Sequence, residues 1–145
     1  MSLIIRSITP MKNTAIAKVF SDIAELLEIR GENAVKIRAY REAARAIEHS
    51  PKEIKIMLEE GEDLRNIPGV GKAIAQKTTE LVTTEKLIYY ENLKAEFPED
   101  ITNLLAIPGI GPKTANRLSN QGISSADALE QAINNGRLAK LFRLD

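Results

Sequence analysis

The sequence contains one pattern twice that could bind a ligand through the backbone. In both copies, a proline and two glycines occur at the same spacing. The stretch NIPGVGKAIAQK covers residues 66–77, and AIPGIGPKTANR covers residues 106–117. In each stretch a hydrophobic residue and a proline lead into Gly-x-Gly, which places glycines at 69 and 71 and again at 109 and 111. Two glycines one residue apart let the backbone turn tightly and approach closely whatever lies against it.

The chemistry that this pattern allows is phosphate binding by backbone amides. The N–H groups of such a turn, together with the free N–H groups of the helix that follows, form a concave surface suited to a phosphate. A basic residue stands at the same place after each turn, Lys77 in the first copy and Arg117 in the second. The pattern therefore predicts two phosphate sites, and the alternative is a tight turn between helices that binds no ligand.

Positive charge is concentrated around the repeated turns, although the whole chain is neutral. Lys and Arg number 20, and so do Asp and Glu, so no overall field attracts nucleic acid or a membrane. Residues 64–79 nevertheless contain three basic residues and no acid, and residues 101–126 contain Lys113 and Arg117 and no acid. Residues 34–47 contain four basic residues and one acid.

The composition excludes several other classes of protein. The chain has no cysteine, which excludes disulfides and thiolate chemistry and fits a cytoplasmic location. No apolar run has the length needed to span a membrane. The opening residues 1–10, MSLIIRSITP, are too short and too polar for a secretory signal, and we interpret them as an N-terminal extension.

The elements that must position the two turns are helices. Apolar residues recur at three- and four-residue steps from Asn13 until the stretch RGEN, and a second helix follows with Asn33 as its cap. Ser50 is expected to cap a third helix, with Pro51 in its first turn. Five more helices are expected, at about residues 71–84, 87–97, 100–106, 112–120 and, between Ser125 as cap and Gly136 as stop, at the end. No segment alternates with a period of two, so the predicted fold is all-α, with two small helical subdomains at residues 11–90 and 91–145.

The repeated turn resembles the helix-hairpin-helix motif, whose glycine turns bind the DNA backbone without reading sequence. The segment GENAVKIRAYREAARAIE, residues 31–48, extends this resemblance to the N-terminal region of family X DNA polymerases, the DNA polymerase beta-like enzymes. The resemblance covers nearly the whole chain from Met11 onward. It implies a lyase-type domain at residues 11–90 and the start of a fingers segment at residues 91–145.

The catalytic palm of that family has no counterpart in this sequence. There is no Asp-x-Asp pair and no Gly-Ser of a nucleotidyltransferase. Because polymerisation needs two metal ions held by such carboxylates, we expect no polymerase activity from this chain alone. The chain is expected to be a fragment or a naturally short relative, with a palm domain that is separate or missing.

The resemblance implies a set of residues that contact the backbone of gapped or nicked DNA carrying a 5′-phosphate. These are Lys36, Tyr40, Arg41, Gly69, Gly71, Lys72, Lys77, Gly109, Gly111, Lys113 and Arg117. It also implies that a monovalent cation, Na⁺ or K⁺, sits at each hairpin on backbone carbonyls, although DNA binding itself requires no cofactor. These carbonyls belong to Arg65, Ile67 and Val70 in the first turn and to Leu105, Ile107 and Ile110 in the second.

Lys77 has two interpretations. In relatives that remove 5′-deoxyribose phosphate, a lysine at this position forms a Schiff base with the sugar aldehyde, which requires a neutral amine. Lys36 and Lys72 are the neighbours expected to favour that form. The sequence departs from the family pattern around this site, with Gln76 in place of a glutamate, Val35 in place of a histidine, and Ala73 and Tyr89 in place of phosphate-binding lysines. Lys77 is otherwise expected to be a phosphate contact or a solvated lysine.

These observations predict a non-sequence-specific DNA-binding module of a family X polymerase that acts in DNA repair, including base excision repair. One alternative is a helical protein–protein interaction module that no longer binds DNA. A further alternative, compatible with DNA binding, is a 5′-deoxyribose phosphate lyase that acts through Lys77.

Overall fold

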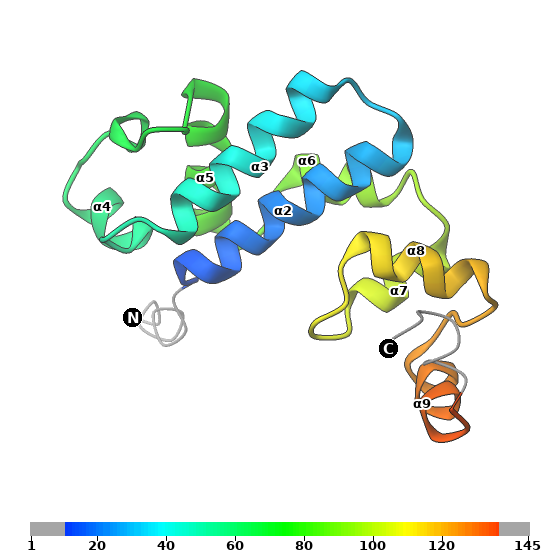
Figure 1. Cartoon of the computed structure of the whole chain (residues 1–145). Coiled ribbons are helices and arrows are strands. Elements are labelled where there is room, and N and C mark those ends of the chain that lie inside the picture. Colours follow the sequence, from blue (N-terminus) through cyan, green and yellow to red (C-terminus); the bar gives the residue numbers. More distant parts are fainter. Residues whose placement is uncertain (1–10, 137–145) are drawn as a thin grey trace. The chain divides into compact units, whose positions relative to one another are not determined.

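The structure is a computed structural model of the chain, and it describes residues 11–136. Every regular element in that part of the chain is a helix, which confirms the predicted all-α fold there (Figure 1). Residues 1–10, which we interpret as an extension, and residues 137–145 lie outside the described part. None of the described helices is both long enough and apolar enough to cross a bilayer.

The chain divides into two compact units, with the boundary after Glu91. The helices of the first unit are α2 (Asn13–Arg30), α3 (Ala34–Glu48), α4 (Ile54–Glu59), the 3₁₀ helix η1 (Leu64–Asn66) and α5 (Lys72–Thr84). The boundary falls inside α6 (Ile88–Lys94). The second unit contains α7 (Glu99–Leu105), α8 (Pro112–Asn120) and α9 (Ala126–Asn134).

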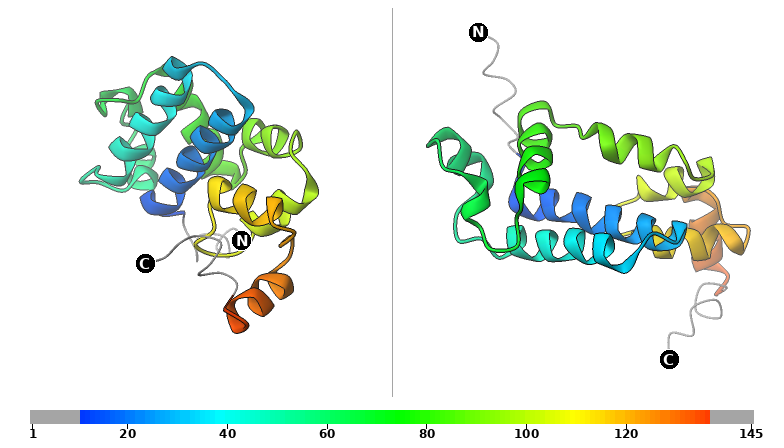
Figure 2. Two further views of the ribbon diagram at one scale, coloured as in Figure 1. Left: turned by 45° about the vertical axis from the view of Figure 1, so that its right-hand side comes forward. Right: turned by 90° about the horizontal axis from the view of Figure 1, so that it is seen from above.

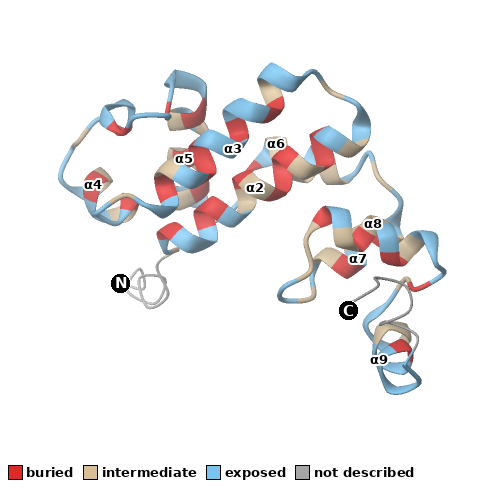
Figure 3. Cartoon of the chain, viewed as in Figure 1, coloured by how far each residue is buried: buried red, intermediate tan, exposed pale blue. Residues whose placement is uncertain are grey.

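The core of the first unit lies between α2 and α3, which run side by side in all views (Figures 1 and 2). Apolar residues of α3 at three- and four-residue steps, namely Ile37, Tyr40, Ala44 and Ile47, are buried, and Figure 3 shows buried residues along both helices. The largest contributions come from Phe20, Ile23 and Leu27 of α2 and from Ile37 and Ile47 of α3. Burial of each such side chain stabilises the fold by about 1.5–3 kcal/mol. The packing of α2 against α3 is therefore the main source of stability of the first unit.

Most helix ends follow the local signals in the sequence. The first helix ends at Gly31, which adopts a left-handed conformation at φ 90°. Asn33 caps α3, because its side chain accepts a hydrogen bond from the Lys36 N–H at 2.9 Å. Ser125 caps α9 in the same way, accepting from the Ala128 N–H at 3.1 Å.

The start of the third helix is different from the prediction. The α4 helix begins at Ile54 with Glu53 as its cap residue, and the Ser50 hydroxyl instead donates to the Lys52 carbonyl at 2.9 Å. The reason is a tertiary contact from the buried Asn13 of α2. Its side-chain amide donates to the Lys52 carbonyl at 3.0 Å and accepts from the Ile54 N–H at 2.8 Å, so a distant residue sets where α4 begins.

The second unit has its own small core, in which α7 and α8 pack together. The buried members are Ile101, Leu104, Ala115, Leu118, Ile123 and Ala132. Ala115 is completely buried, as expected for a small residue where two helices meet, whereas Ala75 in the first copy is only half-buried. Each copy of the repeated turn therefore belongs to a different packed unit.

Candidate nucleic-acid interface

The first Pro-Gly-x-Gly stretch forms a tight turn that leads directly into α5. The Ile67 carbonyl accepts a hydrogen bond from the Val70 N–H at 3.0 Å, and Gly69 between them has φ +99°. Proline second and a positive-φ glycine third are the requirements of a type II β-turn. Gly71 then serves as the cap residue of α5, and its carbonyl accepts from the Ala75 N–H at 2.8 Å.

The second stretch repeats this backbone geometry at the start of α8. The Ile107 carbonyl accepts from the Ile110 N–H at 3.1 Å, and Gly109 has φ +88°. Gly111 is the cap residue of α8, and its carbonyl accepts from the Ala115 N–H at 2.8 Å. The sequence repeat is thus also a repeat of conformation and hydrogen bonding.

Each turn presents backbone N–H groups at the start of a helix of at least nine residues. The first N–H groups of an α-helix have no acceptor within the helix, and the helix dipole adds positive potential there. Lys72 occupies the first position of α5, whereas Pro112, which has no N–H, occupies the first position of α8. The first turn therefore offers one more amide donor than the second.

Gly71 is well suited to a close approach by a ligand. It is exposed, its φ of −88° is open to any residue, and a Cβ built on it meets no atom within 4 Å. Gly69 is more constrained, because a Cβ there would lie 3.3 Å from the Cβ of Ala46 on α3. The first turn is consequently packed against α3 on one side and open to solvent at Gly71.

The predicted basic residues do not all have the same surroundings. Lys72, Lys113 and Arg117 are exposed near their turns. Arg41 forms an ion pair with Glu28 of α2, so part of its charge is already balanced. Lys36 and Lys77 are half-buried and lie elsewhere, with both ammonium groups near one aromatic ring.

Lys36, Tyr40 and Lys77, which belong to the DNA-contact set that the family resemblance implies, lie around Tyr89 of α6. The ammonium of Lys77 lies 5.0 Å from the centre of the Tyr89 ring, and that of Lys36 lies 5.8 Å from it. Both distances are within the range of a cation–π contact. Three helices, α3, α5 and α6, thus place two positive charges at one ring.

Tyr89 is also part of an aromatic stack that reaches the core. Its ring stacks on Tyr40 with centroids 5.9 Å apart and an interplanar angle of 7°, and Tyr40 contacts Phe20 at 6.1 Å. Burial raises the pKa of the Tyr40 phenol well above its usual range, and the neighbouring Tyr89 phenol adds to this. Among the described residues, nothing forms a hydrogen bond with the buried Tyr89 hydroxyl.

The sequence alone identifies Tyr89 only as a departure from a family pattern and misses this ring as the common neighbour of the two lysines. It also misses Asp22, which lies in the apolar stripe of α2 and accepts a hydrogen bond from the Tyr90 hydroxyl at 3.0 Å. Two features of the sequence could have pointed to these residues. Tyr89 and Tyr90 are adjacent in a chain with three tyrosines, and Asp22 is a carboxylate inside an apolar stripe.

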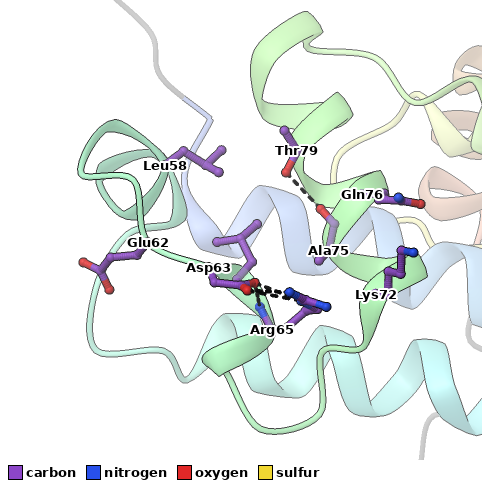
Figure 4. Close-up of a pocket in the computed structure, with 9 residues that line it drawn as sticks. Leu58, Glu62, Asp63, Arg65, Lys72, Ala75, Gln76 and Thr79 are labelled. Atoms are coloured by element: carbon purple, nitrogen blue, oxygen red, sulfur yellow. Dashed lines mark hydrogen bonds and ion pairs between the residues drawn. The ribbon is translucent and has the colours of Figure 1, made fainter.

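A cavity of about 620 Å³ lies beside the first turn, between α4, η1 and α5 (Figure 4). Lys72 and Gln76 line it from α5. Arg65 also lines it, but its guanidinium donates to the Asp63 carboxylate at 2.8 Å. The Arg65 side chain and its backbone N–H together lower the pKa of Asp63 to about 2. This cavity therefore combines charges of both signs and does not form a purely basic surface.

The carbonyl groups predicted to hold a monovalent cation lie in the two turns. Within residues 11–136, the carbonyls of Arg65 and Val70 accept no backbone hydrogen bond in the turn, and only that of Ile67 is engaged. Carbonyl oxygens are suitable ligands for hard cations, so the donor set fits such an ion. No group of three His, Asp or Glu side chains in the described part of the chain could hold a metal.

Comparison with known proteins agrees with this geometry. Residues 11–87 match the family model of the helix-hairpin-helix domain, and residues 101–142 match that of a SAM-like helix-hairpin-helix tandem. The chain is 30% identical over 123 residues to the DNA polymerase/3′-5′ exonuclease PolX of Bacillus subtilis (strain 168), an alignment that covers 84% of this chain and 21% of that protein. It is 29% identical over 122 residues to DNA polymerase lambda of Arabidopsis thaliana, with 83% of this chain and 22% of that protein covered.

The aligned region therefore spans about a fifth of the length of these two relatives. The first family model alone accounts for more than half of the chain. It contains the first turn, α5 and the residues Lys36, Tyr40 and Lys77, and it ends at Leu87, two residues before Tyr89. The second contains the other turn and α8. The chain belongs to the helix-hairpin-helix domain family, and it is homologous over most of its length to DNA polymerases of family X.

Proposed function

We propose that this chain binds duplex DNA through its phosphate backbone, without reading base sequence, as part of a family X DNA polymerase. The observation that carries this proposal is the repetition of one turn, with the same hydrogen bonds and the same glycine conformations, at the start of α5 and of α8. Both turns place the first amides of a helix next to lysine or arginine. Such groups bind phosphate, which is common to every DNA sequence.

The preferred substrate in this proposal is gapped or nicked DNA with a 5′-phosphate. The first turn would bind the downstream duplex and the second turn the upstream or primer duplex. The charges of Lys36 and Lys77 at the Tyr89 ring would meet the 5′-phosphate, since two ammonium groups on one ring suit a dianionic group. The proposed setting is DNA repair, including base excision repair in the cytoplasm.

A monovalent cation would assist each turn in this proposal. The carbonyls of Arg65, Ile67 and Val70 would hold it in the first turn, and those of Leu105, Ile107 and Ile110 in the second. When bound, the cation supplies positive charge beside the phosphate. The chain's own contribution is the set of amide donors and the shape of the turn.

The substitution Gly71→Val tests this proposal, because the fold itself tolerates a side chain at that position. The φ of −88° suits a β-branched residue, and no atom of the protein lies within 4 Å of the new Cβ. We expect Gly71→Val to weaken binding to nicked DNA by about tenfold or more, since the new side chain keeps phosphate away from the amides. Thr83→Val, at the other end of α5, is the matched control and should bind normally.

Two results would overturn the proposal. One is normal DNA binding by both Gly71→Val and Gly111→Val, with circular dichroism showing that both are folded. The other is a preference of more than about tenfold, or ~1.4 kcal/mol, for one duplex over another of equal length. A folded chain that binds no DNA at all would favour the interaction-module alternative.

A second candidate activity is 5′-deoxyribose phosphate lyase through Lys77. The observation that favours it is the convergence of Lys77 and Lys36 on one half-buried site. Borohydride trapping on DNA with a 5′-deoxyribose phosphate tests it, and an adduct that Lys77→Arg loses while still binding DNA would establish it. We expect only a small trapped fraction, because Ala73 and Tyr89 cannot hold the sugar phosphate and a loosely placed reactant reacts slowly.

A further inference from the structure

The α6 helix is attached to α2 by a buried hydrogen bond. The Tyr90 hydroxyl donates to the Asp22 carboxylate at 3.0 Å, and the side chain of Asp22 is only 9% exposed. Lys18, one helical turn earlier, donates to the same carboxylate oxygen at 2.9 Å. Burial raises the pKa of Asp22, although the ion pair and hydrogen bond from Lys18 and the hydrogen bond from Tyr90 act in the opposite direction.

Tyr89 precedes Tyr90 in α6, and its ring stacks on Tyr40 of α3. Its hydroxyl is buried with no hydrogen-bond partner among the described residues, and an unmet hydroxyl disfavours the buried position. The ring must therefore be held through its packing and through the backbone of α6. The contact that attaches α6 to α2 is the hydrogen bond from Tyr90 to Asp22.

The ring in turn determines where two flexible cations lie. Lys36 is on α3 and Lys77 is on α5, and each has a long side chain that loses rotamer freedom when it is ordered. Their ammonium groups repel each other, and the negative face of an aromatic ring within about 6 Å offsets part of this repulsion. If the ring moved, nothing would offset the repulsion between the two ammonium groups, and the lysine side chains would move apart.

We propose that Asp22 and Tyr90 are positioning residues for the lysine pair: their hydrogen bond holds α6 so that the Tyr89 ring keeps Lys36 and Lys77 at one place. The geometric part of this proposal is independent of DNA. Its consequence for DNA rests on the proposed function, in which the lysine pair meets a 5′-phosphate. Asp22 and Tyr90 touch no DNA in this scheme and act only through Tyr89.

The test measures the lysines directly by NMR on the whole chain. Methylene protons of Lys77 close to the Tyr89 ring are shifted upfield by its ring current, and Tyr89→Leu gives the unshifted reference value. We expect Tyr90→Phe and Asp22→Ala to lose most of this shift, while Asp22→Asn keeps it because an amide oxygen still accepts the Tyr90 hydroxyl. Lys18→Gln removes the ion pair alone and serves as the matched control, with the shift retained.

An unchanged Lys77 shift in a folded Tyr90→Phe chain would overturn the proposal, and so would an equal loss in Asp22→Asn and Asp22→Ala. If Asp22→Ala does not fold, Tyr90→Phe and Asp22→Asn decide the question. The second measurement is affinity for nicked DNA with a 5′-phosphate, which Tyr90→Phe and Tyr89→Leu should each reduce by about two- to fivefold. A lost NMR shift with unchanged affinity would support the positioning role and contradict the proposed part of the lysines in DNA binding.

Discussion

At the scale of single residues, the first unit contains all three tyrosines of the chain, and the ring of Tyr89 lies next to two lysines. Tyr40 links the core to Tyr89, and Tyr90 links α6 to Asp22. The ammonium groups of Lys36 and Lys77 therefore both lie within cation–π distance of one ring that is packed on the core. This arrangement suits a ligand that supplies the negative charge itself.

The Tyr89 hydroxyl provides a direct test of this description. Tyr89→Phe keeps the ring and removes a buried hydroxyl that has no partner, so the free energy of unfolding should stay the same or rise by up to about 1 kcal/mol. Urea unfolding measures it, with Tyr89→Leu as the comparison that loses the ring and should be less stable. A loss of more than about 1 kcal/mol in Tyr89→Phe would show that the hydroxyl has a partner.

The Asp63 carboxylate predicts a specific pH dependence. Its pKa is lowered to about 2 in the folded chain, so it stabilises the fold above its ordinary pKa of 3.8 and this contribution is lost as the pH falls toward 2. Urea unfolding should therefore show Asp63→Asn less stable than the wild type near neutral pH, with the difference shrinking below about pH 4.

Arg65→Gln is the control for this prediction, because the Arg65 side chain is the main cause of the lowered pKa. In that background the effect of Asp63→Asn at neutral pH should be smaller, as expected for two coupled residues. A difference that is equal at all pH values, or that grows on acidification, would contradict the prediction.

At the scale of secondary-structure elements, the two turns share a conformation but have different support. A Cβ at Gly69 would press on Ala46 of α3, whereas a Cβ at Gly109 would meet no atom within 4 Å. The first turn is therefore built into the packing of its unit. The second turn needs glycine only for its backbone angle.

This difference predicts unequal costs for the same substitution. Both glycines have positive φ, so alanine should cost about 1 kcal/mol at Gly109 and about 2 kcal/mol or more at Gly69, where strain and overpacking add. Urea titration followed by amide resonances of each unit measures the two values separately. Equal losses, or a larger loss in Gly109→Ala, would contradict the packing described here.

The sequence predicts those elements whose signals are local. Asn33, Ser125 and the two glycine turns end or begin helices through contacts within a few residues, and they lie where expected. The start of α4 is different, because Asn13 on another helix sets it. Lys36, Tyr40 and Lys77 are identified through a family resemblance and not from local patterns. The hydrogen bond between Asp22 and Tyr90 depends on how α6 packs on α2, and no local sequence pattern predicts that packing.

At the scale of the whole molecule, each of two units carries one copy of the glycine turn, so the proposed binding surface is divided between them. The first unit alone has the lysine pair at Tyr89. This predicts that a nicked duplex with a 5′-phosphate binds about two- to tenfold more tightly than the same nick with a 5′-hydroxyl, a difference of ~0.4–1.4 kcal/mol. Lys36→Gln should reduce that ratio in a fluorescence anisotropy titration, while Gly111→Val should weaken both substrates and leave the ratio unchanged.

The central claim is that both turns bind DNA phosphates, and the salt dependence of affinity tests it most directly. Lys36, Lys72, Lys77, Lys113 and Arg117 would neutralise about five phosphate charges, so log affinity for nicked DNA should fall linearly with log salt with a slope of about −4 to −5. Lys72→Gln and Lys113→Gln should each reduce the steepness of that slope by about 1, and Lys55→Gln on α4 should leave it unchanged. An affinity that does not vary with salt, or a slope that neither of the two turn substitutions changes, would contradict the claim that these turns hold the DNA backbone.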